Sequence, residues 1–178
     1  RTSTWAGGPP AVWPRFLPFV GTVNTTARDA VFRAGVRAEL PADCAWMEGD
    51  YQTTPTRGLQ ALARVSAGWG FSQEFYNQGL YRQLGFSSVE EVITGFWEKR
   101  YMRRDANNLL SMLRTWQLND VSTIPSYRGA LPAALGSIRA NAPVLAAPTD
   151  LYFTPSAVDA HRAHTPGPRF RFRPYLWS

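Results

Sequence analysis

The chain has 178 residues, of which 44% are apolar and 13% aromatic, and this composition excludes an intrinsically disordered protein. The net charge is +6, but no nucleic-acid-binding motif accompanies it, so we expect no nucleic-acid partner. A single cysteine excludes a disulfide within the chain, and no apolar run is long enough to span a bilayer. The stretch 1–14 lacks a continuous apolar segment, so we expect no signal peptide. Together these features predict a cytoplasmic protein of one domain that does not act at a membrane.

The first predicted elements are a strand and a helix. The apolar run "RFLPFVGT", Arg15 to Thr22, is typical of a short buried strand. A helix is predicted over "NTTARDAVFRAGVRAEL", with Thr25 or Thr26 as its N-cap and Asp29 in its first turn. Its apolar face consists of Phe32, Val36 and Leu40. A strand, a polar turn and a helix in this order indicate an α/β fold.

A long helical region follows. Residues 41–55 contain prolines and a glycine and predict a loop, and helical periodicity then continues to about Asp120. The strongest helix is "SSVEEVITGFWEKRYMRR", where Ser88 and Glu91 form a capping box. Its expected apolar face consists of Val89, Val92, Ile93, Phe96 and Trp97. A further helix starts after Asp105, a predicted cap.

The α/β pattern returns near the C-terminus. The sequence predicts a helix over 130–140, a strand over 143–147, a helix over 156–164 and a segment with strand character over 169–178. We therefore divide the chain into a partial α/β core over 1–40, a helical insertion over 41–128 and a second core region over 129–178. An insertion of this length is no ordinary connection, and we expect it to cover a site.

Asp150 lies in a polar turn directly after the predicted strand over 143–147. Ligands of parallel sheets bind beyond the carboxyl ends of the strands, so an acid at this position can orient a catalytic histidine. The alternative interpretation is that Thr149 and Asp150 only cap a turn. The pattern alone leaves both interpretations open.

Three blocks of the sequence resemble the homoserine O-acetyltransferase-like branch of the α/β-hydrolase superfamily. They are "RFLPFVGTVNTTARDAVFRAGVRAEL", "RRDANNLLSMLRTWQLNDVS" within the helical region, and "PVLAAPTDLYFTP". The resemblance covers about residues 15–175 and implies part of an α/β-hydrolase fold with a helical cap. It also implies acyl transfer or ester hydrolysis through a serine acyl-enzyme, with Asp150 as the triad acid and no metal or organic cofactor.

The same resemblance places Arg104, Asp105 and Asn107 in the substrate-binding part of the cap. Homoserine acetyltransferases carry a tyrosine shortly after the matching asparagine, whereas this chain has Asn108, Leu109 and Leu110 there. This departure favours an esterase or another acyl transferase. A small acyl substrate is implied in either case, and acyl-CoA only if the protein is a transferase.

The other two members of a triad are missing from the sequence. None of the eleven serines lies in a G-x-S-x-G frame, which the nucleophile of this fold requires. His161 and His164 precede the last predicted strand, whereas the family places its histidine after that strand. Two histidines alone also make a weak metal site, and surface positions are the simpler interpretation.

Three interpretations therefore stay open. The chain is a truncated part of an enzyme, a degenerate homologue, or a non-catalytic module that binds a partner. We expect the chain alone to be inactive, since triad residues act as a unit. A half-sheet with an unpaired edge also predicts homo-oligomers or aggregation.

Overall fold

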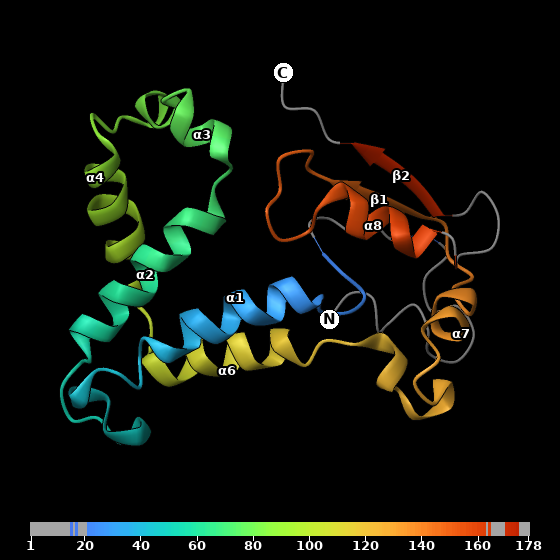
Figure 1. The fold of residues 1–178 in the computed structure, drawn as a ribbon, viewed down its shortest axis with the longest axis horizontal. Coiled ribbons are helices and arrows are strands. Elements are labelled where there is room, and N and C mark those ends of the chain that lie inside the picture. Colours follow the sequence, from blue (N-terminus) through green and yellow to red (C-terminus); the bar gives the residue numbers. More distant parts are fainter. Residues whose placement is uncertain (1–14, 16, 18–20, 163, 165–169, 175–178) are drawn as a thin grey trace. The chain divides into compact units, whose positions relative to one another are not determined.

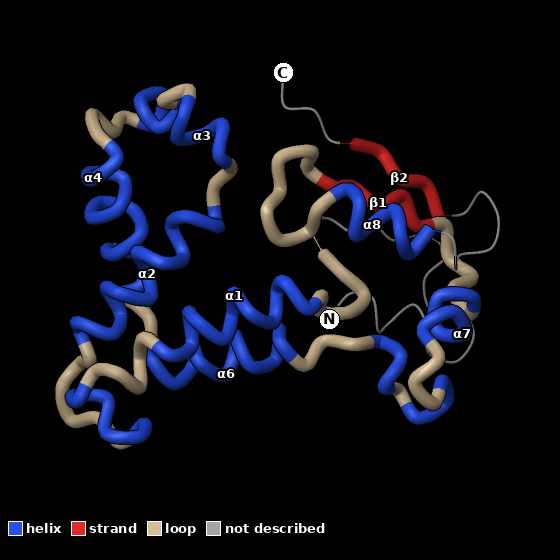
Figure 2. Tube along the Cα trace, in the orientation of Figure 1, coloured by secondary structure: helices blue, strands red, loops and turns tan. Residues whose placement is uncertain are grey.

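The computed structural model describes residues 15, 17, 21–162, 164 and 170–174 (Figure 1). The chain divides into two compact units. The first, here called the helical unit, runs from Ala27 to Gln117. The second, called the sheet unit, combines Arg1–Thr26 with Leu118–Ser178. Figure 2 shows helices and loops in the helical unit, whereas the described strands belong to the sheet unit. The division into a partial core over 1–40, a helical insertion over 41–128 and a second core region over 129–178 stays a prediction.

The helical unit contains α-helices of very different lengths, with single turns between them. They are α1 (Ala27–Ala38), η1 (Cys44–Gly49), α2 (Thr56–Gly70), α3 (Gln73–Asn77), η2 (Leu80–Leu84), α4 (Val89–Val92), η3 (Ile93–Glu98), α5 (Lys99–Tyr101) and α6 (Ala106–Gln117). Helices α1 and α6 lie side by side (Figure 1). The predicted apolar face is confirmed, because Phe32 and Val36 of α1 and Leu40, two residues after its end, are all buried.

The helix predicted over residues 87–104 differs from a regular α-helix. Its middle section, η3, is a π-helix, which places one extra residue in each turn and shifts the register of everything that follows. Of the predicted apolar face, Val92 and Trp97 are buried, whereas Val89 is 41% exposed, and the charged Glu98 is buried next to Trp97. The capping box also differs in detail: Ser88 Oγ accepts the N–H of Glu91 (3.1 Å), but the Glu91 carboxylate accepts the N–H of Ser87 (2.6 Å).

An aromatic core fills the space between α2 and the α4–η3 helix. Its buried members are Ala63, Ala67, Tyr81, Val92 and Trp97. Further aromatic side chains pack around them: Phe71, Phe75, Tyr76, Phe86, Phe96 and Tyr101. The same helices are joined at their polar edge, where Arg64 Nε donates to Glu98 (2.6 Å) and Arg64 Nη2 to Glu90 (2.9 Å). These contacts fix the π-helix against α2.

Asp43 connects the turn η1 to the first turn of α2. Its Oδ2 accepts a hydrogen bond from the N–H of Gly58 (2.8 Å), and its Oδ1 accepts one from the N–H of Ala45 (3.0 Å). The residue is buried, with 9% of its surface exposed. The Gly58 bond first, and then the Ala45 bond, lower the pKa of the Asp43 carboxyl, although burial opposes them.

Replacing Asp43 with alanine should lower the free energy of unfolding by about 2 kcal/mol, because two N–H groups lose a charged acceptor. The folded pKa lies below the unfolded one, so this stabilisation is complete above about pH 4 and is lost as the pH falls through the folded value. Urea unfolding at neutral and acid pH measures both effects. Asp50→Ala, which removes an exposed carboxylate from the same loop, should change stability by less than about 0.5 kcal/mol. Equal losses for the two variants would contradict the assignment.

The sheet unit is built around two parallel strands. Its elements are η4 (Val121–Thr123), η5 (Pro125–Tyr127), α7 (Leu131–Gly136), β1 (Ala142–Ala146), α8 (Pro155–Arg162) and β2 (Phe170–Pro174). Ala142 pairs with Phe170 and Ala146 with Pro174. The predicted strand over Arg15–Thr22 is represented by one parallel bridge, from Arg15 to Asn141, and most of its residues lie outside the described ones. Helix α7 ends at Gly136, four residues earlier than predicted.

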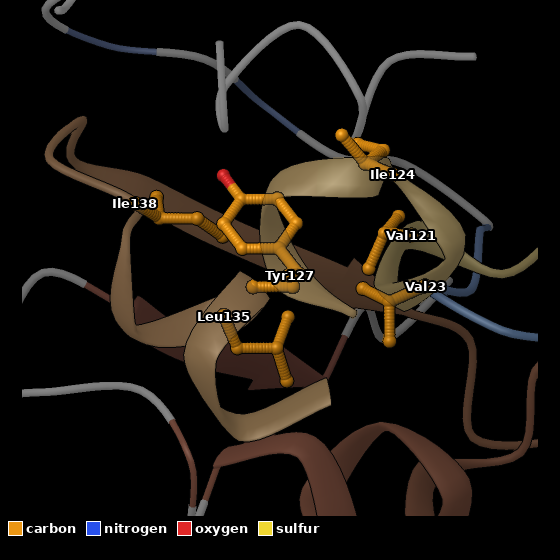
Figure 3. Close-up of a pocket in the computed structure, with 7 residues that line it drawn as sticks. Val23, Val121, Ile124, Tyr127, Leu135 and Ile138 are labelled. Atoms are coloured by element: carbon orange, nitrogen blue, oxygen red, sulfur yellow. The ribbon is translucent and has the colours of Figure 1, made fainter. Parts of the chain in front are cut away.

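The sheet unit also contains a small apolar cluster. Val23, Val121, Ala134 and Leu135 are buried in it. Figure 3 shows Tyr127 lying across this cluster between Ile138 and the two valines. The cavity among these side chains has a volume of about 10 Å³, which is room for one water molecule at most. Because its lining is apolar, we interpret it as a packing defect and not as a ligand site.

Candidate functional site

Asp150 follows the carboxyl end of β1 in the loop that leads to α8. Its N–H donates to Ala147 O (3.2 Å), and its Oδ1 accepts the N–H groups of Tyr152 (2.8 Å) and Phe153 (2.9 Å). Within the described part of the chain, Oδ2 of this half-buried carboxylate has no hydrogen-bond partner. One oxygen is thus held by the backbone while the other can still accept a bond. The available Oδ2 fits a triad acid. The two bonds to Oδ1 are those of a turn cap, which is the alternative interpretation.

Asp105 and Tyr51 form a pair at the start of α6. Asp105 Oδ1 caps the helix by accepting the N–H of Asn108 (2.7 Å), and Oδ2 accepts the Tyr51 hydroxyl. The Tyr51 oxygen in turn accepts the N–H of Ala106 (3.3 Å). The tyrosine bond first, and then the Asn108 bond, lower the pKa of Asp105, while pairing with Asp105 and burial raise the pKa of Tyr51. The carboxylate predicted to bind substrate is therefore engaged within its own unit.

Asn107 holds the turn η1 against α6. Its Oδ1 accepts the indole N–H of Trp46 (3.1 Å), and its Nδ2 donates to Gly49 O (2.8 Å). The turn contains three successive residues with positive φ: Met47 (47°), Glu48 (54°) and Gly49 (101°). Only glycine adopts this backbone without strain, and two of the three are not glycine. Asn107 thus stabilises a strained turn, and a Cβ at position 49 would lie 3.1 Å from its Oδ1.

Arg104 is the third predicted cap residue, and its side chain is exposed. Its N–H donates to Tyr101 O (2.9 Å) at the end of α5. Arg104, Asp105 and Asn107 belong to the helical unit, whereas Asp150 belongs to the sheet unit. The role of all four in binding or catalysis stays a prediction. Trp46 and Tyr51 are not among the predicted site residues, although two large aromatic residues around a glycine in a polar loop are a usable signal.

His161 and His164 lie at the end of α8. Among the described residues, His161 Nε2 is buried without a hydrogen-bond partner, whereas His164 is exposed. Burial first, and then the neighbouring His164, lower the pKa of His161. No group of three or more His, Cys, Asp or Glu side chains in the described chain is placed to hold a metal ion.

The lowered pKa of His161 predicts acid destabilisation of the sheet unit. The unfolded chain binds a proton near pH 6.5, roughly the ordinary value, while the folded chain does so only at lower pH. The free energy of unfolding should therefore fall as the pH is lowered from about 6.5 to the folded pKa and stay level below it. His161→Gln should remove this slope in urea titrations between these pH values. His164→Gln, which changes an exposed imidazole on the same turn, should largely keep it, and loss of the slope only in the His164 variant would refute the assignment.

No helix in the described ranges combines the length and the apolar character that crossing a membrane requires. No family model matches the sequence. The chain is 32% identical over 173 residues to a protein named "Probable esterase" from Corynebacterium glutamicum, and 30% identical over 173 residues to "Ethyl acetate hydrolase" from Pseudomonas veronii. Both matches cover 96% of this chain and 49% of the relative.

The structure is also similar to solved ones. It matches an acetylester hydrolase from Corynebacterium glutamicum with a TM-score of 0.90 and 31% identity, over 97% of this chain and 49% of the other. The chain has the fold of part of an α/β-hydrolase. This result confirms the predicted partial α/β-hydrolase fold, and the chain spans about half the length of the curated relatives it matches. A homoserine O-acetyltransferase from Bacillus anthracis, with a TM-score of 0.75 but 20% identity over 96% of this chain and 48% of the other, shares the fold alone.

Proposed function

We propose that this chain contributes the acid, Asp150, to the Ser-His-Asp triad of an esterase that hydrolyses small esters. The observation that carries the proposal is the Asp150 carboxylate at the end of β1, with Oδ1 held by two backbone N–H groups and Oδ2 available. Support comes from the two relatives with at least 30% identity, whose names describe an esterase and an ethyl acetate hydrolase. The nucleophile and the base are not assigned to residues of this sequence.

In this mechanism Asp150 Oδ2 accepts the Nδ1–H of the triad histidine. The bond fixes the tautomer in which Nε2 takes the proton from the serine hydroxyl as the serine attacks the ester carbonyl. The resulting imidazolium is stabilised by the carboxylate and gives its proton to the departing alcohol. Water then attacks the acyl-enzyme with the same histidine as base and releases the acid.

Hydrolysis is favoured over acyl transfer to homoserine. Asn108, Leu109 and Leu110 stand where homoserine acetyltransferases carry a tyrosine, and similarity to a solved homoserine acetyltransferase is confined to the fold. In this proposal Asp105 and Asn107 hold the loop before α2 against α6. Arg104 is exposed, and it is the residue of the three that we propose contacts the substrate. Use of acyl-CoA, self-association through a sheet edge and a cytoplasmic location stay predictions.

The test compares two reactions of the native polypeptide that carries these residues. Acid release from ethyl acetate is followed in a pH-stat. Acetyl transfer from acetyl-CoA to homoserine is followed by the release of the free thiol of CoA. We expect acid release without homoserine-dependent thiol. Transfer without ester hydrolysis would replace the esterase by a transferase, and the absence of both reactions would favour a non-catalytic binding module. The isolated 178-residue chain, expected to be inactive, is the control.

A further inference from the structure

The helix that runs from α4 through η3 to α5 holds one residue more than a continuous α-helix would. The Lys99 N–H donates to Thr94 O, five residues earlier, as well as to Phe96 O. The next turn is α-helical again, since the Met102 N–H donates to Glu98 O (2.8 Å). Everything after η3 is therefore turned by one residue, about 100° around the axis, relative to a continuous α-helix.

Arg64 of α2 binds one glutamate before η3 and one at its end. Its Nη2 lies 2.9 Å from Glu90 Oε1, and its Nε lies 2.6 Å from Glu98 Oε1. These glutamates are eight residues apart, which in a continuous α-helix is about 2.2 turns and leaves their side chains about 80° apart around the axis. With one residue absorbed by the π turn, the spacing equals seven α-helical residues, and the angle falls to about 20°. The π register thus aligns both carboxylates for one guanidinium.

Glu98 is the end of this bridge that a change of register would disturb most. The residue is 8% exposed, and its Oε2 also accepts a hydrogen bond from Gln60 Nε2 (3.2 Å). A buried carboxylate that loses its partners is costly, whereas the exposed Glu90 can turn to water. The bond between Arg64 and Glu98 therefore opposes a change of η3 to the α register.

The segment that follows η3, residues 99–104, carries four exposed basic side chains. They are Lys99, Arg100, Arg103 and Arg104. Within the described chain none of the four forms an ion pair. The acids on either side of the segment are engaged by other groups, Glu98 by Arg64 and Asp105 by Tyr51. These two anchored carboxylates fix the ends of the segment and leave its positive charges facing solvent.

We infer that Arg64 is a positioning residue, which keeps η3 in the π register and thereby sets the direction of Arg104. A change to the α register would turn the start of the segment by about 100°. Its end would stay in place, because Asp105 is bound to Tyr51, so the Arg104 side chain would be redirected. The inference rests on the proposed function insofar as Arg104 contacts the substrate, whereas the hold on the register does not depend on it.

The first test deletes one residue from the π turn of the native polypeptide. Deletion of Gly95 should leave an α-helix in which the residues after it keep their places, so the urea concentration at half-unfolding should stay close to that of the wild type. Gly68 is the matched control, because it is also an exposed glycine but lies in the α-helix α2. Its deletion turns the rest of α2 by about 100° and should lower that concentration strongly. Equal losses for the two deletions would refute the extra residue.

The second test uses the ester hydrolysis of the same polypeptide. Arg64→Met, which removes both ion pairs, should raise KM for ethyl acetate by about tenfold, as for one lost charge-assisted hydrogen bond, and leave kcat within about twofold. Deleting Gly95 in this variant should restore KM, because the α register then directs Arg104 as the π register did. Arg114→Met, which changes an exposed arginine of α6, should alter neither constant. An unchanged KM in Arg64→Met, or no restoration by the deletion, would overturn the positioning role.

Nuclear magnetic resonance of the same polypeptide separates this inference from the proposed function. The Thr94 Hα and the Lys99 N–H lie close together in the π register and are separated in a regular α-helix. The nuclear Overhauser effect between them should be present in the wild type and lost in Arg64→Met. If the wild type has no esterase activity, the proposed function fails, while loss of this signal still supports the hold of Arg64 on the register. Persistence of the signal in Arg64→Met would overturn the inference.

Discussion

Replacing Asp150 with asparagine is expected to lower kcat for ester hydrolysis by about 10⁴ while leaving the fold intact. The amide oxygen of asparagine can still accept the N–H groups of Tyr152 and Phe153, so the loop after β1 keeps its hydrogen bonds. At the position of Oδ2, however, the amide presents an NH₂ donor. A donor cannot accept the Nδ1–H of a histidine, and the imidazole is left in the wrong tautomer with its positive charge unstabilised. The measurement is the steady-state rate with ethyl acetate, in the native polypeptide, next to thermal unfolding of the same sample.

The alanine variant separates catalysis from turn capping. Asp150→Ala should lose both the activity and the two hydrogen bonds of the turn, with a cost of about 1–2 kcal/mol in the free energy of unfolding. If Asp150 only caps the turn, Asp150→Asn will keep full activity and Asp150→Ala will be less stable but equally active. That pattern would remove the triad assignment and leave the esterase relatives as evidence of fold alone.

Local periodicity was sufficient to predict many elements. The buried face of α1 and the start of α6 after Asp105 follow from spacing and capping preferences alone. The π-helix η3 was not predictable in this way, because its apolar residues Ile93, Phe96 and Trp97 keep regular helical spacing. Its extra residue is stabilised by tertiary contacts, namely Trp97 in the aromatic core and Glu98 bound to Arg64. Arg64 and Glu98 are 34 residues apart in the sequence.

The candidate site was predictable to different degrees. Asp150 was found because a strand end followed by an acid is a local pattern. The partners of Asp105 and Asn107 were not found, because Tyr51 and Trp46 lie 54 and 61 residues away in the sequence. A helix-capping aspartate and a substrate-binding aspartate also have the same local sequence. Distinguishing them needs the hydrogen bonds, which show Asp105 engaged by a tyrosine hydroxyl and a backbone N–H.

The second large effect is expected from Gly70→Ala at the end of α2, which should lower the free energy of unfolding by about 3 kcal/mol. A methyl group at this position would overlap the Trp97 ring, whose Cζ2 lies only 2.8 Å from the ideal Cβ position. The ring cannot move away easily, because Trp97 is 8% exposed and lies against Phe71 (centroids 5.2 Å) and Phe96 (5.4 Å). Overpacking of this kind forces side chains off their rotamers or shifts the backbone.

Gly68 in the same helix gives a matched control, since nothing lies within 4 Å of its ideal Cβ position. Gly68→Ala should be neutral or should stabilise the chain by about 0.5–1 kcal/mol, because alanine loses less backbone entropy in a helix than glycine does. Urea unfolding of both variants, followed by tryptophan fluorescence, compares them directly. Equal effects of the two substitutions would mean that Trp97 does not pack against Gly70. A loss confined to Gly70→Ala would establish this contact as the reason that α2 ends in a glycine, and would place the π-helix within the cooperative core of the helical unit.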